Sequence, residues 1–277
     1  MTNEAPGDEP GEQEPEAVPS SDPSDWRTPL SSGRPSEALA RLRALAVVGR
    51  GAALVEREVG LLVEALIALR NRDYREAERL VPLLEGVTEP DARRYAVGFA
   101  DGLAALQAAD AKRRNPDAAR ERLLAAVGQP LTAAEAENNL GVLAIREADS
   151  ERAERNFRSA LKADPRHHRA ITNLGNLDLE AGRVDEAIAR YREAIRLNES
   201  YATAHNNLAA ALKRAGKTGE AVRSLKRSQR LAFRTPDAAR GATPNHPVGR
   251  PGGQGRSRLW IWFVAGGAIV VALRLLR

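Results

Sequence analysis

Cysteine is absent from this sequence of 277 residues. Without it the chain can form neither disulfide frameworks nor thiolate metal sites, and the absence is consistent with a reducing compartment. Aromatic residues make up only 4% of the chain, although hydrophobic residues make up 43%. This composition favours helices packed through alanine and leucine over a β-sandwich. We therefore expect an all-α protein.

Residues arranged to bind a metal or a cofactor are also lacking. The chain has four histidines; His167 and His168 are adjacent and diverge on a helix, and no acidic ligand set surrounds them. The segment from Gly216 to Gly219 lacks the preceding glycine and strand of a phosphate-binding loop. No Ser/His/Asp arrangement stands out. We expect no metal site, no cofactor and no enzymatic activity.

Basic residues are missing from the first 25 positions, which carry eight acids. The rest of the chain holds all 42 Lys and Arg residues against 29 acids, a net charge of +13. Residues 1–35 are rich in Pro, Glu, Gly and Ser, and Trp26 and Leu30 are their main large apolar side chains. Such a segment buries too little surface to offset its ordering entropy, so we expect it to be disordered.

Three stretches of the chain share one pattern at a spacing of 34 residues. In each, a Leu and a small residue are followed by another small residue and, four positions later, by an aromatic residue or Leu. The small residues let two helices approach closely. The pattern comprises Leu140, Gly141, Ala153, Phe157 and Ala160, then Leu174, Gly175, Ala187, Tyr191 and Ala194, then Leu208, Ala209, Ala221 and Leu225.

This pattern resembles the tetratricopeptide repeat, a helix–turn–helix unit. The resemblance implies a right-handed superhelical solenoid that binds another protein or a peptide segment. Three repeats are expected within 132–233, at about 134–167, 168–201 and 202–233.

Residues 36–131 are expected to form degenerate helical repeats. Helical periodicity begins at Ser36, a plausible N-cap. One unit out of phase is indicated by Tyr74, Ala77, Val81 and Leu84; a second, with its turn at Asn115-Pro116, is indicated by Leu106, Ala119, Leu123 and Ala126.

The resemblance also implies a binding site. In tetratricopeptide repeats the first helix of each unit lines a concave groove, and the residue before the Leu-Gly pair points into it. A protein-binding groove is thus implied at Asn139, Asn173 and Asn207, with their neighbours Asn138 and Asn206. An amide offers a donor and an acceptor, so a ladder of amides can hold the backbone of an extended peptide. The alternative is that they solvate the groove or bond the neighbouring helix.

Family members that clamp chaperone carboxylates add Lys or Arg one turn away from this Asn. The corresponding residues here are Glu135, Arg169 and Thr203. Only Arg169 fits, which puts a carboxylate clamp in doubt.

The C-terminal part of the sequence predicts a membrane anchor. Residues 234–257 are rich in Pro and Gly and should form a flexible linker. Within 258–277, the run from Leu259 to Leu273 is unbroken and apolar. A core helix would have a polar face, so we expect a transmembrane helix. Trp260 and Trp262 stand where interfacial aromatic residues are found.

More basic residues precede this run than follow it, so the positive-inside rule places the repeats in the cytoplasm. A chain rich in Arg and Ala suggests a GC-rich bacterial genome, which is a codon argument. Together these features predict a single-pass protein of a bacterial inner membrane. Its membrane-proximal basic residues would be Arg223, Arg227, Arg230, Arg256 and Arg258.

These bases could contact anionic lipid or nucleic acid. No aromatic platform for base stacking accompanies them, so lipid is favoured and nucleic acid is not expected. The sequence thus predicts a membrane-tethered scaffold or adaptor that recruits a partner through the concave face of its repeats. One alternative is a basic module that senses anionic lipid. Another is a subunit of a larger membrane complex, packed through the small residues from Ala265 to Ala268.

Overall fold

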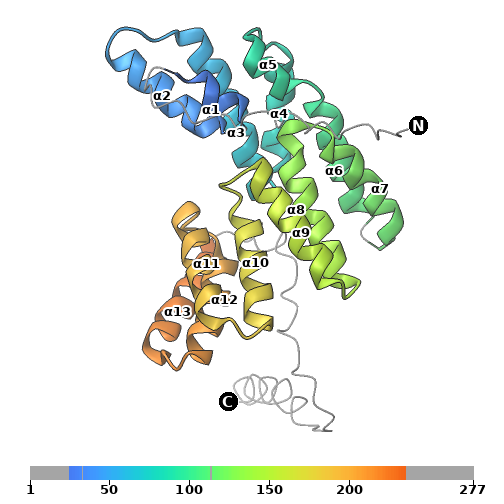
Figure 1. The fold of residues 1–277 in the computed structure, drawn as a ribbon, viewed down its shortest axis with the longest axis vertical. Coiled ribbons are helices and arrows are strands. Elements are labelled where there is room, and N and C mark those ends of the chain that lie inside the picture. The colour runs from blue at the N-terminus through green and yellow to red at the C-terminus, as the bar shows by residue number, and fades with distance from the viewer. Residues whose placement is uncertain (1–24, 33, 113, 235–277) are drawn as a thin grey trace, which may run out of the picture. The chain divides into compact units, whose positions relative to one another are not determined.

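The computed structural model describes residues 25–32, 34–112 and 114–234, and every regular element in these ranges is an α-helix (Figure 1). The helices are α1 (Arg27–Ser31), α2 (Pro35–Val47), α3 (Ala53–Asn71), α4 (Tyr74–Glu85), α5 (Pro90–Ala96), α6 (Phe99–Ala111), α7 (Pro116–Val127), α8 (Pro130–Arg146), α9 (Ser150–Ala163), α10 (His168–Glu180), α11 (Val184–Leu197), α12 (Ala202–Arg214) and α13 (Thr218–Arg234).

The predicted linker lies outside the described residues except for its first position, and so does the whole predicted transmembrane segment 258–277. Among the helices of the described ranges, none has the length and apolar character needed to cross a membrane.

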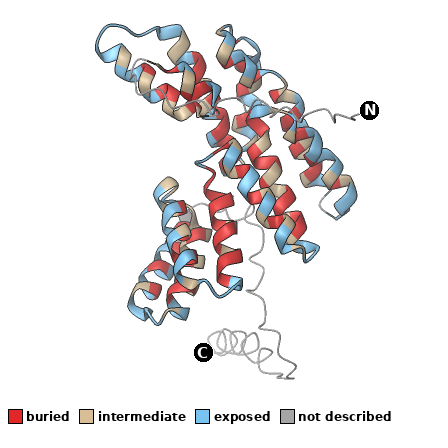
Figure 2. Ribbon diagram, viewed as in Figure 1, coloured by how far each residue is buried: buried red, intermediate tan, exposed pale blue. Residues whose placement is uncertain are grey.

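The last six helices form three successive helix–turn–helix units. α8 packs against α9, α10 against α11 and α12 against α13. The second helix of one unit also packs against the first helix of the next, as α9 does with α10 and α11 with α12. Each unit therefore buries its apolar face partly against its neighbour, and α10 is buried along nearly its whole length (Figure 2). The predicted all-α repeat solenoid is confirmed.

The Leu-Gly positions mark the closest approach within a unit. A Cβ atom added to Gly175 would lie 2.8 Å from Cε1 of Tyr191, closer than real Cβ contacts come, and one added to Gly141 would collide with the Phe157 ring. Both rings are buried. Glycine is thus required here because an aromatic ring from the second helix occupies the space of a side chain.

The third unit changes both partners of this contact together. Ala209 replaces the glycine, and Leu225 stands where Phe157 and Tyr191 stand in the earlier units. Ala209 is buried, whereas Leu225 is 41% exposed. The third unit therefore lacks the buried aromatic ring that the first two units place against their glycine.

The turn between the two helices of a unit requires a left-handed backbone. The φ angles of Ala148, Gly182 and Gly216, at a spacing of 34 residues, are +59°, +80° and +74°. Glycine adopts this conformation without steric cost, whereas alanine does not. The first unit thus carries backbone strain that the other two avoid.

Two further helix pairs precede these units in the region where degenerate repeats were expected. α6 packs against α7, whose N-cap residue Asn115 accepts a hydrogen bond from the backbone N–H of Ala118 at 3.2 Å. α3 packs against α4, which Asp73 caps in the same way. The short helix α5 lies between the two pairs in sequence and breaks the 34-residue spacing.

The predicted disorder of residues 1–35 is wrong for their last part. α1 is helical, and its neighbour Trp26 and its own Leu30 are buried because α1 packs against α2 and α5. Ser36 is not an N-cap, since α2 already begins at Pro35. Trp26 and Leu30, the main large apolar side chains of residues 1–35, therefore hold α1 against the rest of the fold.

The buried small residues of the repeat pattern provide a test of the register. Ala187 of α11 is fully buried, whereas Ala189 on the same helix is exposed. We expect Ala187→Leu to lower the free energy of unfolding by about 1–3 kcal/mol through overpacking. Ala189→Leu should leave it nearly unchanged. Thermal unfolding of the two variants checks this, and equal destabilisation would contradict the register.

Candidate protein-binding face

The first helices of the three units, α8, α10 and α12, carry the predicted groove residues. Asn139, Asn173 and Asn207 each precede a buried leucine of the repeat pattern and are half-buried. One residue corresponds to about 100° around a helix, so a buried leucine turns its predecessor towards the edge of the buried face. The three amides occupy the same position in successive first helices.

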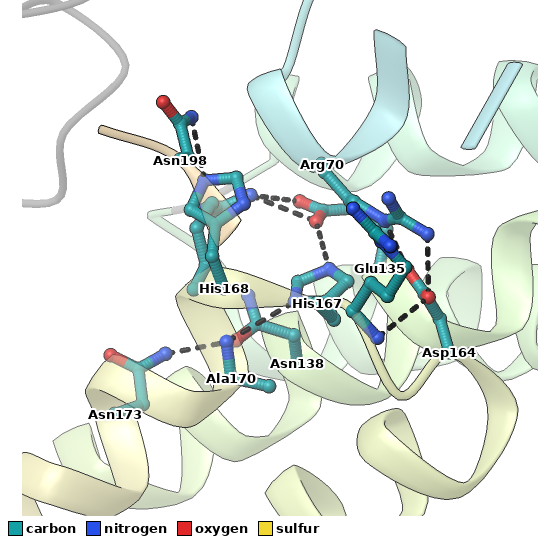
Figure 3. A network of polar contacts seen from close by, with 11 residues as sticks. Arg70, Glu135, Asn138, Asp164, His167, His168, Ala170, Asn173 and Asn198 are labelled. Carbon is teal, nitrogen blue, oxygen red and sulfur yellow. Dashed lines mark hydrogen bonds and ion pairs between the residues drawn. The ribbon is translucent and has the colours of Figure 1, made fainter. Parts of the chain in front are cut away.

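Two of these amides bond the neighbouring first helix. Nδ2 of Asn173 donates to Oδ1 of Asn138 on α8 at 2.9 Å (Figure 3). Nδ2 of Asn207 donates to Oδ1 of Asn176 on α10 at 2.8 Å. That same Oδ1 atom also accepts a hydrogen bond from the Tyr191 hydroxyl at 2.8 Å. The alternative that these amides bond the neighbouring helix therefore holds for the donor atoms of Asn173 and Asn207.

The row of amides on α8, α10 and α12 also contains side-chain oxygen atoms, which can accept hydrogen bonds. Within the described residues, Oδ1 of Asn173 and Oδ1 of Asn207 take part in no hydrogen bond, and the half-buried Asn139 and Asn206 form no side-chain hydrogen bond. Asn138 is fully buried, and its Nδ2 lacks an acceptor there. The row can still accept hydrogen bonds from the N–H groups of another chain.

Arg169 was predicted to line the groove, but this prediction is wrong because its side chain is buried and already paired. Its Nη1 donates to both carboxylate oxygens of Glu135, at 2.6 and 2.8 Å. Nε2 of His167 lies 3.1 Å from the same carboxylate, and Nδ1 of His167 accepts the backbone N–H of Ala170 at 3.1 Å. Since Nδ1 is an acceptor, Nε2 carries the proton and donates to Glu135.

Glu135 stays ionised in this setting. Burial alone raises the pKa of its carboxyl group, but the charge of Arg169 and the hydrogen bond from His167 outweigh it and lower that pKa to about 2. One carboxylate thus neutralises the arginine that a carboxylate clamp would need, so this chain does not present such a clamp.

Glu135, His167 and Arg169 form a buried polar cluster, and the end of α3 extends it from a distant part of the sequence. Arg70 forms a buried ion pair with Asp164, in which Nη2 donates to Oδ1 at 2.6 Å (Figure 3). Nδ2 of Asn198 donates to Oδ1 of Asn71 at 3.2 Å. These contacts are not predictable from the sequence, since 94 and 127 residues separate the partners and no periodicity links them.

The turn after α3 completes the cluster. Arg72, whose φ is +57°, pairs with Asp110. The Tyr74 hydroxyl is buried without a hydrogen-bond partner in the described part of the chain. Burial and the charge of Glu135 raise the pKa of Tyr74. The degenerate N-terminal helices therefore cover part of the face that the sequence predicted to be an open groove.

His168 lies at the edge of the cluster. Its ring packs edge-on against Tyr201, with centroids 4.7 Å apart, and Nε2 lies 3.4 Å from Nδ2 of Asn198. Burial lowers the pKa of His168 to about 3, and the charges of Arg169 and Arg70 act in the same direction. The folded protein thus holds this histidine neutral at physiological pH.

The remaining predicted residues lie on or beyond α13. Arg223, Arg227 and Arg230 are exposed on this helix. Arg256 and Arg258 lie outside the described residues.

With this geometry in place, comparison with known proteins identifies the repeat class. The family described as "TPR repeat" matches residues 175–216, and the family described as "Tetratricopeptide repeat" matches residues 144–192. Residues 144–216, from the end of α8 to the turn after α12, thus carry tetratricopeptide repeats. No curated protein matches the sequence.

Solved structures with a similar arrangement of helices include two of MamA. The first is 20% identical and aligns over 59% of this chain and 91% of its own, with a TM-score of 0.41. The second is also 20% identical and aligns over 68% and 99%, with a TM-score of 0.40. A structure from work on Pseudomonas aeruginosa pilF is 18% identical over 68% and 90%, with a TM-score of 0.41.

The buried histidine makes folding stability depend on pH. Its folded pKa lies below the unfolded value of about 6.5, so the unfolded state binds the proton first. The stabilisation is present above that value and is lost as the pH falls towards the folded pKa. We expect the free energy of unfolding to fall by about 2 kcal/mol between about pH 6.5 and pH 5.

Denaturant titration across this pH range checks the expectation. His168→Phe, which keeps the edge-on contact with Tyr201, should remove most of the slope. His205→Gln, at a half-buried histidine of α12, should remove less. An unchanged slope in His168→Phe would show that His168 is not the group responsible.

Proposed function

We propose that the protein is a membrane-tethered scaffold whose repeats bind an extended segment of a partner protein. The observation that carries the proposal is the row of amides on α8, α10 and α12, whose acceptor atoms remain available while two of its donors fix neighbouring helices together. Acceptors held in place by such bonds suit the backbone N–H groups of a peptide, whatever its side chains.

Hydrogen bonds join α8 to α10 and α10 to α12, so successive first helices lie side by side. Packed helices lie about 8–10 Å apart. A polyproline II helix advances about 3.1 Å per residue and repeats after three residues, which is about 9 Å. A peptide in this conformation would present the same side to each successive first helix. We therefore propose that successive repeats contact residues of the partner segment that are about three positions apart.

The tether is proposed from the sequence. The apolar run from Leu259 to Leu273 has no polar face, which supports a membrane anchor. The basic residues before it favour a cytoplasmic position for the repeats. The scaffold would then hold its partner at the membrane surface.

Asn139 provides the cleanest test of the binding face, because it forms no side-chain hydrogen bond within the described ranges. Asn139→Ala should weaken partner capture by about 1–2 kcal/mol, roughly 5- to 30-fold, without changing thermal stability. Asn173→Ala should lower both, since it also leaves Oδ1 of Asn138 without its donor. Quantitative capture from detergent-solubilised membranes, followed by mass spectrometry, measures the loss.

Asn156→Ala on the second helix α9 is the matched control, and it should retain the same proteins as the unmodified chain. Proteins lost only with Asn139→Ala and Asn173→Ala are the candidates for the partner. Equal recovery with all variants would contradict the proposed face.

A separate measurement tests the tether. The full chain should remain in carbonate-washed membranes, whereas a chain ending at Gly255 should be released, because it lacks the apolar run. Recovery of the full chain in the supernatant would rule out the anchor and leave the binding face to be judged on its own.

A further inference from the structure

α13 has an uncompensated positive charge. Glu220 is its single acid, and that carboxylate is paired with Arg192 of α11 at 2.9 Å. The exposed bases of α13 are Arg223, Lys226, Arg227 and Arg230. None of them forms an ion pair with a described residue. Nε of Arg230 donates a hydrogen bond to the backbone oxygen of Lys226 at 3.4 Å.

Some exposed arginines elsewhere in the described residues pair within their own helix. On α4, Arg79 pairs with Glu76; on α5, Arg94 pairs with Asp91; on α9, Arg158 pairs with Glu154. Each of these pairs joins residues three or four apart, the spacing at which helix side chains meet. On α13 the single acid, Glu220, stands three residues before Arg223 but pairs with Arg192 of α11 instead.

The preceding unit shows which positions have changed. Arg223 and Arg227 of α13 correspond, at a spacing of 34, to Ala189 and Glu193 of α11. Two positions of the last unit's second helix have therefore become basic, while Lys226 and Arg230 correspond to Arg192 and Arg196, which are basic already.

Exposed apolar side chains accompany the bases. Val222 is 47% exposed and Leu225 is 41% exposed. Their counterparts Ile188 and Tyr191 on α11 are buried, and they belong to one apolar cluster with Leu208 and Leu212 of α12. The outer side of α13 thus carries two exposed apolar side chains together with four bases that form no ion pair with a described residue.

We propose that this side of α13 docks on an anionic lipid surface, with Val222 and Leu225 at the headgroup boundary and the bases against lipid phosphates and carboxylates. A basic amphipathic helix has the chemistry for such a surface, which offers anionic groups and an apolar layer together. A purely polar polyanion would satisfy the charges but leave the two apolar side chains exposed. The inference rests on the proposed tether, which supplies the membrane.

The chain after α13 supports the same occupant. Residues 235–258 separate α13 from the apolar run, and 24 residues can span at most about 80 Å. An anchored chain would therefore keep α13 at a high effective concentration near the bilayer. Each single contact can then be weak and still hold the helix on the surface.

The absence of cysteine allows a direct experiment on the full chain. A single Val222→Cys substitution, labelled with an environment-sensitive fluorophore, reports the polarity around α13. The labelled chain is reconstituted into vesicles of phosphatidylcholine alone, or of phosphatidylcholine with about 30% phosphatidylserine. Ala189→Cys, at an exposed position of α11, is the matched control.

We expect the emission of the Val222 probe to shift to shorter wavelength with phosphatidylserine but not with phosphatidylcholine alone. The shift should diminish when the salt concentration rises from about 0.1 M to about 0.5 M, because salt screens exposed charges. Replacing Arg223, Arg227 and Arg230 together by Glu should abolish it. These residues are exposed, so the circular dichroism spectrum should show the same helix content.

A Val222 signal that is equal in both vesicle types would overturn the inference, as would an equal shift at position 189. A blue-shifted signal already present in detergent, and lost when the acidic residues 1–24 are removed, would assign the surface to the protein's own N-terminal segment instead. Flotation of the same samples reports the tether separately. Chains that float without a shift dependent on phosphatidylserine retain the tether and refute the docking surface.

Discussion

The close approach of the two helices within each repeat is the constraint on which the rest of the structure depends. At Gly141 and Gly175 the backbone of the first helix lies against a buried ring of the second, where even one added carbon would collide. This contact sets the distance and rotation between the two helices. The first two units repeat this contact, and the third keeps a small residue, Ala209, in place of the glycine. Equivalent residues of α8, α10 and α12 therefore occupy equivalent positions, and this packing brings the amide row together.

The polar cluster joins the regular repeats to the less regular helices before them. Glu135 of α8 and Arg169 of α10 are buried together, and Arg70 of α3 is buried against Asp164. Buried ions contribute little net stability when they are paired, but removing one partner is costly because the other remains desolvated. The cluster therefore penalises arrangements in which α3 is displaced from the repeats.

The amide row and α13 differ in chemistry, and this difference suggests a division of roles. The row offers neutral acceptors, which suit a polypeptide backbone without selecting its side chains. α13 offers unpaired cations beside exposed apolar groups, which suit a lipid surface. A scaffold that uses both surfaces would hold its partner's backbone while its last helix rests on the membrane.

The helical repeat could be predicted from the sequence alone, because small and large residues at a fixed spacing reflect the packing between helices that are close along the chain. Gly175 and Tyr191 were predictable for this reason, and so was the capped turn at Asn115. The burial of Arg169 was not predictable in this way, and neither was the contact of Arg70 with Asp164 or that of α1 with α5. These contacts join residues far apart in sequence, where the burial of a charge or of Trp26 depends on which surface arrives from elsewhere in the chain.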